Sequence, residues 1–169
     1  MKWLMTWCDL APRRVFFAIA LGCVALLSFG QYLQHVVGLE PCPMCIVQRY
    51  AMILVAVSAL LAGATGHNGF QVGGGLATSA WAIAGAYVAA RQSWLQWHPP
   101  EVVSCGRDLY GMIETFPLQR AIPMIFKGGG DCSAIDWTFL GGTIANWSFL
   151  FFCGMGALAL VLVWRRSRS

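Results

Sequence analysis

The apolar residues of this chain are gathered into four long runs, with polar residues between the runs and at the two ends. The runs lie at about 15–36, 46–64, 70–90 and 144–164. Each approaches the length of about 20 mostly apolar residues that an α-helix needs to cross a bilayer. The pattern predicts an all-α membrane protein, a four-transmembrane-helix bundle in which residues 1–169 form a single integral membrane domain.

Two loops on one side of this bundle hold most of the remaining residues, a short one at about 37–45 and a long one at about 91–143. In the long loop, apolar residues recur at helical spacing, at Leu109, Met112, Ile113 and Phe116. This spacing predicts a short amphipathic helix on the membrane surface rather than a fifth span. The first apolar run is long and no clear A-x-A cleavage site follows it, so we expect it to be kept as a span.

Composition and charge agree with this class and indicate an orientation. The chain is 58% hydrophobic and 11% charged, which is outside the range of soluble globular domains. Six of its 11 Lys and Arg residues flank the first and last runs, at Lys2, Arg13, Arg14, Arg165, Arg166 and Arg168. The positive-inside rule therefore predicts cytoplasmic termini and outward-facing loops. The net charge of +4 follows from this orientation and does not indicate nucleic-acid binding.

The cysteines divide by position into two groups. Cys42 and Cys45 lie in the short loop, and Cys105 and Cys132 lie in the long one, so all four are expected to face an oxidising space. In a Gram-negative bacterium this space is the periplasm. The remaining cysteines, within spans or in the cytoplasmic tail, are Cys8, Cys23 and Cys153, and we expect no chemical role for them.

Three interpretations of the outward pairs compete. A structural staple is the usual role of paired cysteines in an exported protein. A zinc or iron–sulfur site is possible by count, but Cys105 and Cys132 lack companion ligands at metal-binding spacing, so we expect no metal. A c-type haem needs a His directly after Cys45, where Ile46 stands. The third interpretation is a pair of redox disulfides that exchange electrons.

The position of the first pair favours redox chemistry. The sequence Cys42-Pro43-Met44-Cys45 comes just before the second run, so Cys45 is expected at or near the N-terminus of that helix. The positive end of the helix dipole, with Arg49 one turn further on, favours the thiolate form of Cys45. A charged side chain at membrane depth is costly and is a functional candidate, although Arg49 is also close enough to the interface to snorkel.

The chain resembles the DsbB family, the bacterial inner-membrane disulfide-bond oxidases. The resemblance is carried by "QHVVGLEPCPMCIVQR", by "LQWHPP" followed by Cys105, and by "GGDCSAIDWTFLGG" with Trp147 after it. Two Cys pairs, with an Arg four residues after the CxxC, make this pattern specific. The family's activity implies a thiol:quinone oxidoreductase that reoxidises a periplasmic DsbA-like thiol oxidase and supports periplasmic protein folding.

The resemblance also implies roles for individual residues. Cys105 would be the sulfur attacked by the thiolate of the DsbA-like partner, with Cys132 as its disulfide partner. Electrons would pass through a Cys42–Cys105 link to the Cys42–Cys45 pair and on to the membrane quinone pool, as ubiquinone or menaquinone. Cys45 would face the quinone, and Arg49 would orient or polarise a quinone oxygen.

One position departs from the family pattern. The family has a His near the end of the third span that helps to hold the quinone, and ungapped alignment puts Gln92 there. Gln can donate a hydrogen bond to a carbonyl oxygen but cannot take up a proton, which leaves the proton path and quinone preference open. His35 and His98 also face outward and could substitute, but a solvated or packed role is the simpler expectation for both.

Two other functions remain as alternatives. A quinone reductase like the vitamin K epoxide reductases also combines a four-helix membrane bundle with two Cys pairs, but there we expect the CxxC late in the chain. A non-enzymatic membrane scaffold would use the disulfides only to staple its outer loops. Such a scaffold gives no reason for Arg49 after Cys45.

Overall fold

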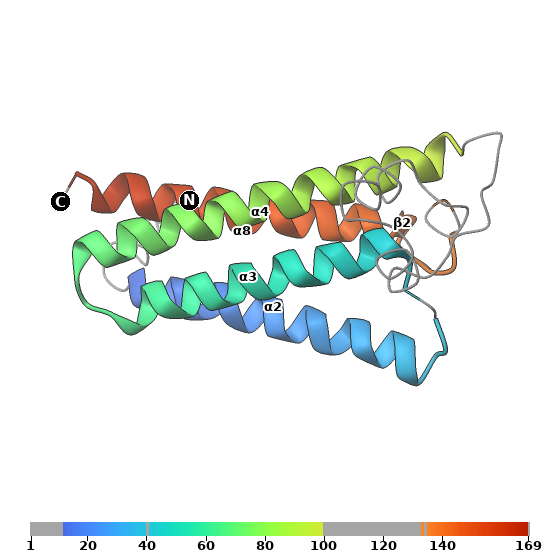
Figure 1. Cartoon of the computed structure of the whole chain (residues 1–169), viewed down its shortest axis with the longest axis horizontal. Coiled ribbons are helices and arrows are strands. Elements are labelled where there is room, and N and C mark those ends of the chain that lie inside the picture. The colour runs from blue at the N-terminus through green and yellow to red at the C-terminus, as the bar shows by residue number, and fades with distance from the viewer. Residues whose placement is uncertain (1–11, 40, 100–132, 134, 169) are drawn as a thin grey trace, which may run out of the picture.

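The structure, a computed structural model, describes residues 12–39, 41–99, 133 and 135–168. Four long helices make up most of this part of the chain (Figure 1). They are α2 (Pro12–His35), α3 (Pro43–Ala64), α4 (Asn68–Trp97) and α8 (Ile144–Arg166). Each is long and apolar enough to cross a membrane, so the prediction of a four-span helical bundle is confirmed.

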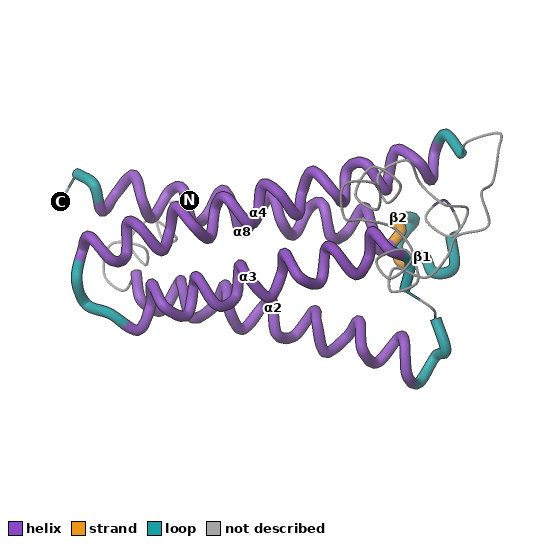
Figure 2. The backbone as a smooth tube through the Cα atoms, viewed as in Figure 1, coloured by secondary structure: helices purple, strands orange, loops and turns teal. Residues whose placement is uncertain are grey.

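Successive helices run in opposite directions, so the bundle has two distinct ends. The start of α2 and the end of α8 lie at one end, which we call the terminal end (Figure 1). The start of α3 lies at the other, which we call the cysteine end because Cys42 and Cys45 are there. Two short strands, β1 (Thr138–Phe139) and β2 (Gly142–Thr143), form an antiparallel hairpin at the cysteine end (Figure 2).

The bundle is not closed evenly around its axis. α2 packs on α3, α3 on α4, and α4 on α8, whereas α2 and α8 barely touch. Most buried residues of α2 lie in its first half, from Pro12 to Cys23, and Leu33 is buried near its far end. Towards the cysteine end, α2 leans away from its neighbours (Figure 1). A side of the bundle between α2 and α8 is therefore left open.

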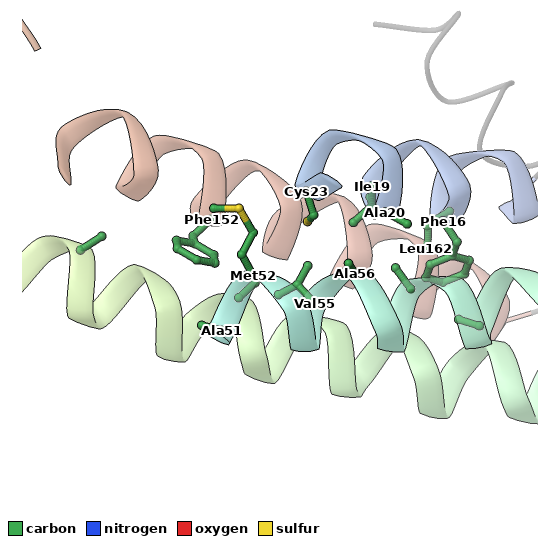
Figure 3. Close-up of a cluster of buried hydrophobic side chains, with 14 residues drawn as sticks. Phe16, Ile19, Ala20, Cys23, Ala51, Met52, Val55, Ala56, Phe152 and Leu162 are labelled. Atoms are coloured by element: carbon green, nitrogen blue, oxygen red, sulfur yellow. The ribbon is translucent and has the colours of Figure 1, made fainter. Parts of the chain in front are cut away.

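Small residues hold the closed part of the bundle together. Its core gathers apolar side chains from all four helices, and many of those from α3 and α4 are alanines (Figure 3). At Gly85 of α4, an added Cβ would lie 2.5 Å from the ring of Phe152 on α8, and at Gly75 it would lie 2.5 Å from Val163. Glycines at such contacts let membrane helices approach closely and gain van der Waals packing.

Two helix boundaries differ from those expected. α3 begins at Pro43 rather than near residue 46, because a proline fits the first turn, where its missing N–H would have no helical partner. α4 continues to Trp97, seven residues past the expected end of the third run, because no proline or glycine stands between residue 90 and Pro99. This extension places Gln92 within α4, five residues before its end. The amphipathic helix predicted for the long loop lies outside the described residues, as do Cys105 and Cys132.

Candidate redox site

The CxxC sequence forms the first turn of α3. Cys42 is the N-cap residue, and its Sγ accepts a hydrogen bond from the backbone N–H of Cys45 at 3.3 Å. This capping satisfies a backbone donor that has no partner within the helix. The Sγ atoms of Cys42 and Cys45 lie 2.8 Å apart, with Cys42 buried and Cys45 half-buried. The prediction that Cys45 lies at the N-terminus of the second span is confirmed.

Gln92 of α4 reaches across to this pair of sulfurs. Its Nε2 lies 3.3 Å from the Sγ of Cys42 and 3.3 Å from that of Cys45. Its Oε1 accepts a hydrogen bond from Nε2 of Gln48, one turn after Cys45 on α3, at 2.6 Å. Both glutamine side chains are buried, at 4% exposure. The two amides and the two sulfurs thus form one network between α3 and α4.

Arg49 points to the other side of α3, towards α2. Its Nη1 donates to Oε1 of Gln34 at 2.5 Å, and its Nη2 donates to the backbone carbonyl of Gly30 at 3.2 Å. A guanidinium group has five N–H donors, so the two bonds to α2 fix its plane and leave other donors to serve a ligand. The half-buried Arg49 is therefore held by protein contacts, rather than extended freely towards the membrane surface.

A cavity of about 800 Å³ lies between these groups and the open side of the bundle. Its wall is mostly apolar and is built by α2, α3, α4, the segment before the hairpin, the hairpin and the start of α8. The polar residues in the wall are Gln34, Cys42, Cys45, Gln48, Arg49, Gln92, Gln96, Asp136, Thr143 and Ser148. Binding sites for organic ligands have this character, with a large apolar wall and a few polar groups that fix orientation.

Aromatic residues form another part of the cavity wall. Phe29 of α2 meets Trp137 edge to face at 5.9 Å between ring centroids, and Trp137 stacks on Phe139 at 6.0 Å. Trp147 of α8 donates its indole N–H to the carbonyl of Phe139 at 2.9 Å, which ties the hairpin to the helix. The hairpin thereby brings residues from beyond α4 over the cavity, next to α2.

The structure brings four of the six predicted site residues to one cavity, namely Cys42, Cys45, Arg49 and Gln92. Cys105 and Cys132 lie outside the described residues. The two histidines considered as substitutes do not line the cavity. His35 is exposed at the end of α2, and the ring of His98 stacks on that of Trp94 at 4.4 Å. The simpler expectation for the histidines therefore agrees with their positions.

Sequence reasoning gave no role to several polar residues of this site. Gln48 was part of the motif but had no assigned role, although a glutamine three residues after Cys45 shares its helix face. That spacing was a usable signal. Gln34 and Gln96 gave no comparable signal, because their place in the wall depends on how α2 and the hairpin pack. The hydroxyl of Thr143, the N-cap of α8, lies 2.7 Å from Oε1 of Gln96.

A four-helix membrane bundle that holds a CxxC pair in the wall of a large, mostly apolar cavity has the features of a membrane thiol oxidoreductase. Comparison with known proteins specifies this class further. The family model described as "Disulfide bond formation protein DsbB" matches residues 12–162, and the chain belongs to this family.

Relatives named Disulfide bond formation protein B are similar over nearly the whole chain. One from Albidiferax ferrireducens is 67% identical over 160 residues, 95% of this chain and 92% of the relative. One from Acidovorax sp. (strain JS42) is 61% identical over 98% of this chain and 95% of the relative. One from Azoarcus sp. (strain BH72) is 57% identical over 90% of each.

Family membership decides between the functions weighed from the sequence. The chain is an oxidoreductase of disulfide-bond formation, as predicted, and this function holds over the stapled scaffold and the vitamin K epoxide reductase-like enzyme. The helices make it a multi-pass membrane protein.

Proposed function

We propose that this chain reoxidises a DsbA-like thiol oxidase in the periplasm and passes the electrons to a quinone of the bacterial inner membrane. The observation that carries the proposal is that Cys45 and Arg49, one helical turn apart on α3, line the same cavity of about 800 Å³. The cavity joins a redox-active pair of sulfurs to a fixed cation in surroundings that suit an apolar ligand.

The residues present fit a quinone. The cavity size is within the range of about 300–1,000 Å³ that is usual for organic ligands. Its wall includes Leu26 of α2 and Leu150 of α8, whose side chains are 38% and 58% exposed on the open side of the bundle. A lipid-soluble ligand can therefore reach the sulfurs from the bilayer without crossing water. Arg49 supplies donors for a quinone oxygen, and an oxygen that gains charge is stabilised by such a group.

The electron balance is simple. A bound quinone would supply an acceptor for two electrons and two protons. The protein partner loses the same two electrons and two protons as its dithiol becomes a disulfide. We propose that Cys105 and Cys132 receive these electrons from the partner, that a Cys42–Cys105 link relays them, and that the Cys42–Cys45 pair delivers them. Cys45 is the sulfur that faces the quinone in this scheme.

Gln92 has two possible roles in this scheme. We predicted from the sequence that it binds the quinone, and its place in the cavity wall is compatible with that role. The contacts of its amide are, however, with Gln48, Cys42 and Cys45. Its direct contact with a quinone stays a prediction. Its position next to both sulfurs suits a second role, in which its amide sets the reactivity of the two thiols.

The proposed orientation places the cysteine end in the periplasm and both termini in the cytoplasm. Arg13, Arg14, Arg165, Arg166 and Arg168 all lie at the terminal end, and an excess of Lys and Arg is typical of cytoplasmic ends. Arg13 also donates to the carbonyls of Gly63 and Ala64, the last residues of α3. The orientation gives Cys42 and Cys45 access to the oxidising side of the membrane.

The proposal is tested by following quinone absorbance when purified protein is mixed with a reduced DsbA-like substrate and a short-chain ubiquinone. We expect loss of the quinone band that requires both the substrate thiols and Cys45, and Cys45→Ser should reduce the rate to background. The same assay with menaquinone compares the two quinones. Correctly folded protein that reduces neither quinone, or a Cys45→Ser variant with full activity, would contradict the proposed electron route.

A further inference from the structure

Two buried glutamines connect α3 to α4 directly beside the redox pair. Gln48 Nε2 donates to Gln92 Oε1 at 2.6 Å, and Gln92 Nε2 then faces the sulfurs of Cys42 and Cys45, 3.3 Å from each. The two side chains are 4% exposed, so water cannot readily replace these bonds. Burying a polar group in a membrane costs free energy unless the group is hydrogen-bonded. It therefore matters which end of each amide donates and which end accepts.

We propose that Gln48 is a positioning residue, which holds the Gln92 amide with its NH2 group towards the two sulfurs and so keeps Cys45 reactive as a thiolate. The inference deepens the proposed function and rests on it, since it concerns the same thiol that delivers electrons to the quinone.

The physical reason is the asymmetry of an amide. A side-chain amide has a donor end and an acceptor end of nearly the same shape, and packing alone does not choose between them. A thiolate accepts hydrogen bonds and gains from an N–H donor, whereas a carbonyl oxygen in the same place would repel it. Gln48 occupies the acceptor end of Gln92 with its own NH2 group. The donor end of Gln92 is thereby left for Cys42 and Cys45.

The same arrangement also accommodates the protonated thiol. The Cys45 sulfur lies 3.7 Å from Gln92 Oε1, so a neutral thiol can donate weakly to this oxygen, while the thiolate accepts from Nε2. Arg49 contributes differently, because its hydrogen bonds are with Gln34 and Gly30 of α2. Gln48 therefore acts on the sulfurs through Gln92 of α4, whereas Arg49, the next residue of α3, faces α2 and supplies charge near the ligand.

The test is a double-mutant cycle in the full-length protein, with Gln48→Met, Gln92→Met and the double variant. Methionine keeps the chain length and removes the amide. The readout is the rate at which iodoacetamide, a small neutral reagent, alkylates Cys45 in the reduced and quinone-free protein at fixed pH, measured by mass spectrometry of the Cys45 peptide.

We expect Gln92→Met to slow the alkylation of Cys45 about threefold. Loss of a hydrogen bond to a charged group lowers the thiolate fraction by about tenfold, but a more basic thiolate is also a better nucleophile. Gln48→Met should slow the reaction about two- to threefold, and the double variant should be no slower than Gln92→Met alone. Such non-additivity is expected when one residue acts only through the other.

The matched control is Gln71→Met. Gln71 lies on α4, the helix that carries Gln92, and is 2% exposed. Its amide donates to the carbonyl of Thr65 at the terminal end. This variant loses a buried amide of α4 without touching the sulfurs, so the Cys45 rate should equal that of the wild type within the error of the measurement. Helix content and elution from a sizing column check that all four variants fold.

Three outcomes would overturn the inference: additive effects of the two substitutions, an unchanged rate in folded Gln48→Met, or an equal loss in Gln71→Met. None of these depends on quinone turnover. A failure of the proposed function appears separately, as wild-type protein that does not reduce quinone, while a failure of the inference appears as active wild-type protein without coupling between the glutamines.

Discussion

The closed and open parts of the bundle are built from the same four helices but from different kinds of side chain. In the closed part, towards the terminal end, Gly75 and Gly85 of α4 let α8 approach closely and alanines fill the core. In the open part, towards the cysteine end, α4 carries Gln92 and Gln96 instead. α2 packs into the closed core through Phe16 and its neighbours, and then leans away (Figure 1).

This difference shows how a small membrane protein can be both stable and reactive. Without a hydrophobic driving force between helices in lipid, close packing of small residues supplies much of the association. The closed part provides that packing, so the open part is free to hold a cavity and several buried polar groups. Several of these groups are hydrogen-bonded in pairs across helices, Arg49 with Gln34 and Gln48 with Gln92. The pairing reduces the free energy that their burial costs.

The largest effect is expected from Arg49→Met, which removes the cation of the open part. Loss of a fixed donor for a developing oxyanion reduces catalysis by about 10²-fold or more, so the rate of quinone reduction should fall by about that factor. The fold should survive, because Arg49 is half-buried and does not belong to the core cluster. Steady-state quinone reduction and thermal unfolding in detergent measure the two effects.

Arg49→Lys serves as the control for charge. Lysine keeps the charge but cannot hold the Gln34 oxygen and the Gly30 carbonyl with a planar fork. We expect a rate between those of the wild type and of Arg49→Met. A wild-type rate in Arg49→Met would show that the cation only snorkels, and it would remove Arg49 from the proposed site.

Gly85→Ala tests the close packing of α4 against α8 in the closed part. The new Cβ would lie 2.5 Å from the buried ring of Phe152, so α4 and α8 must separate or the ring must leave its place. Overpacking of this kind typically costs about 1–3 kcal/mol. The melting temperature in detergent should fall, while the rate of quinone reduction per folded molecule should change little.

The matched variant for this experiment is Gly73→Ala on the same helix, where an added Cβ meets nothing within 4 Å. Alanine has the better helix propensity, so Gly73→Ala should be neutral or slightly stabilising. Equal losses of stability in both variants would mean that glycine is needed in α4 for a reason other than the approach of α8.

The sequence predicted the closed part of the molecule better than the open part. Helix number and approximate span positions follow from the lengths of the apolar runs, since few other structures place such runs in a bilayer. The third apolar run was expected to end at about residue 90, where polar residues begin, but α4 continues to Trp97 because nothing between residue 90 and Pro99 breaks the helix. Local composition is a weaker guide to a helix end than the residues that stop a helix.

Within the site, positions along one helix were predictable and positions between helices were not. Cys42 caps α3, and Cys45 and Arg49 lie in its first two turns, so their spacing alone brings them near each other. Gln92 was reached only through the family pattern. The roles of Gln34 and the aromatic wall of Phe29, Trp137 and Phe139 depend on the lean of α2 and on the hairpin, which no local pattern encodes.

A smaller effect is expected from Leu26→Trp, which narrows the open side of the bundle. Leu26 lines the cavity from α2 and is 38% exposed, so a larger side chain there can obstruct the ligand without entering the core. We expect the KM for quinone to rise about fivefold, which corresponds to about 1 kcal/mol, with little change in kcat. Leu21→Trp, on the same helix and 70% exposed but outside the cavity wall, is the control. Equal KM changes in both would argue against entry between α2 and α8.

The smallest effect concerns a polar contact inside the closed part. The hydroxyls of Ser58 on α3 and Thr78 on α4 lie 3.1 Å apart, and each is also within hydrogen-bond distance of a carbonyl of its own helix. Because each hydroxyl keeps a partner when the other is removed, the coupling across the helices should be weak, about 0.6 kcal/mol. A double-mutant cycle of Ser58→Ala and Thr78→Val in an unfolding assay measures it. A coupling energy above about 2 kcal/mol between Ser58 and Thr78 would show that polar pairs also hold the closed part together. The two parts of the bundle would then no longer differ in the kind of contact that joins their helices.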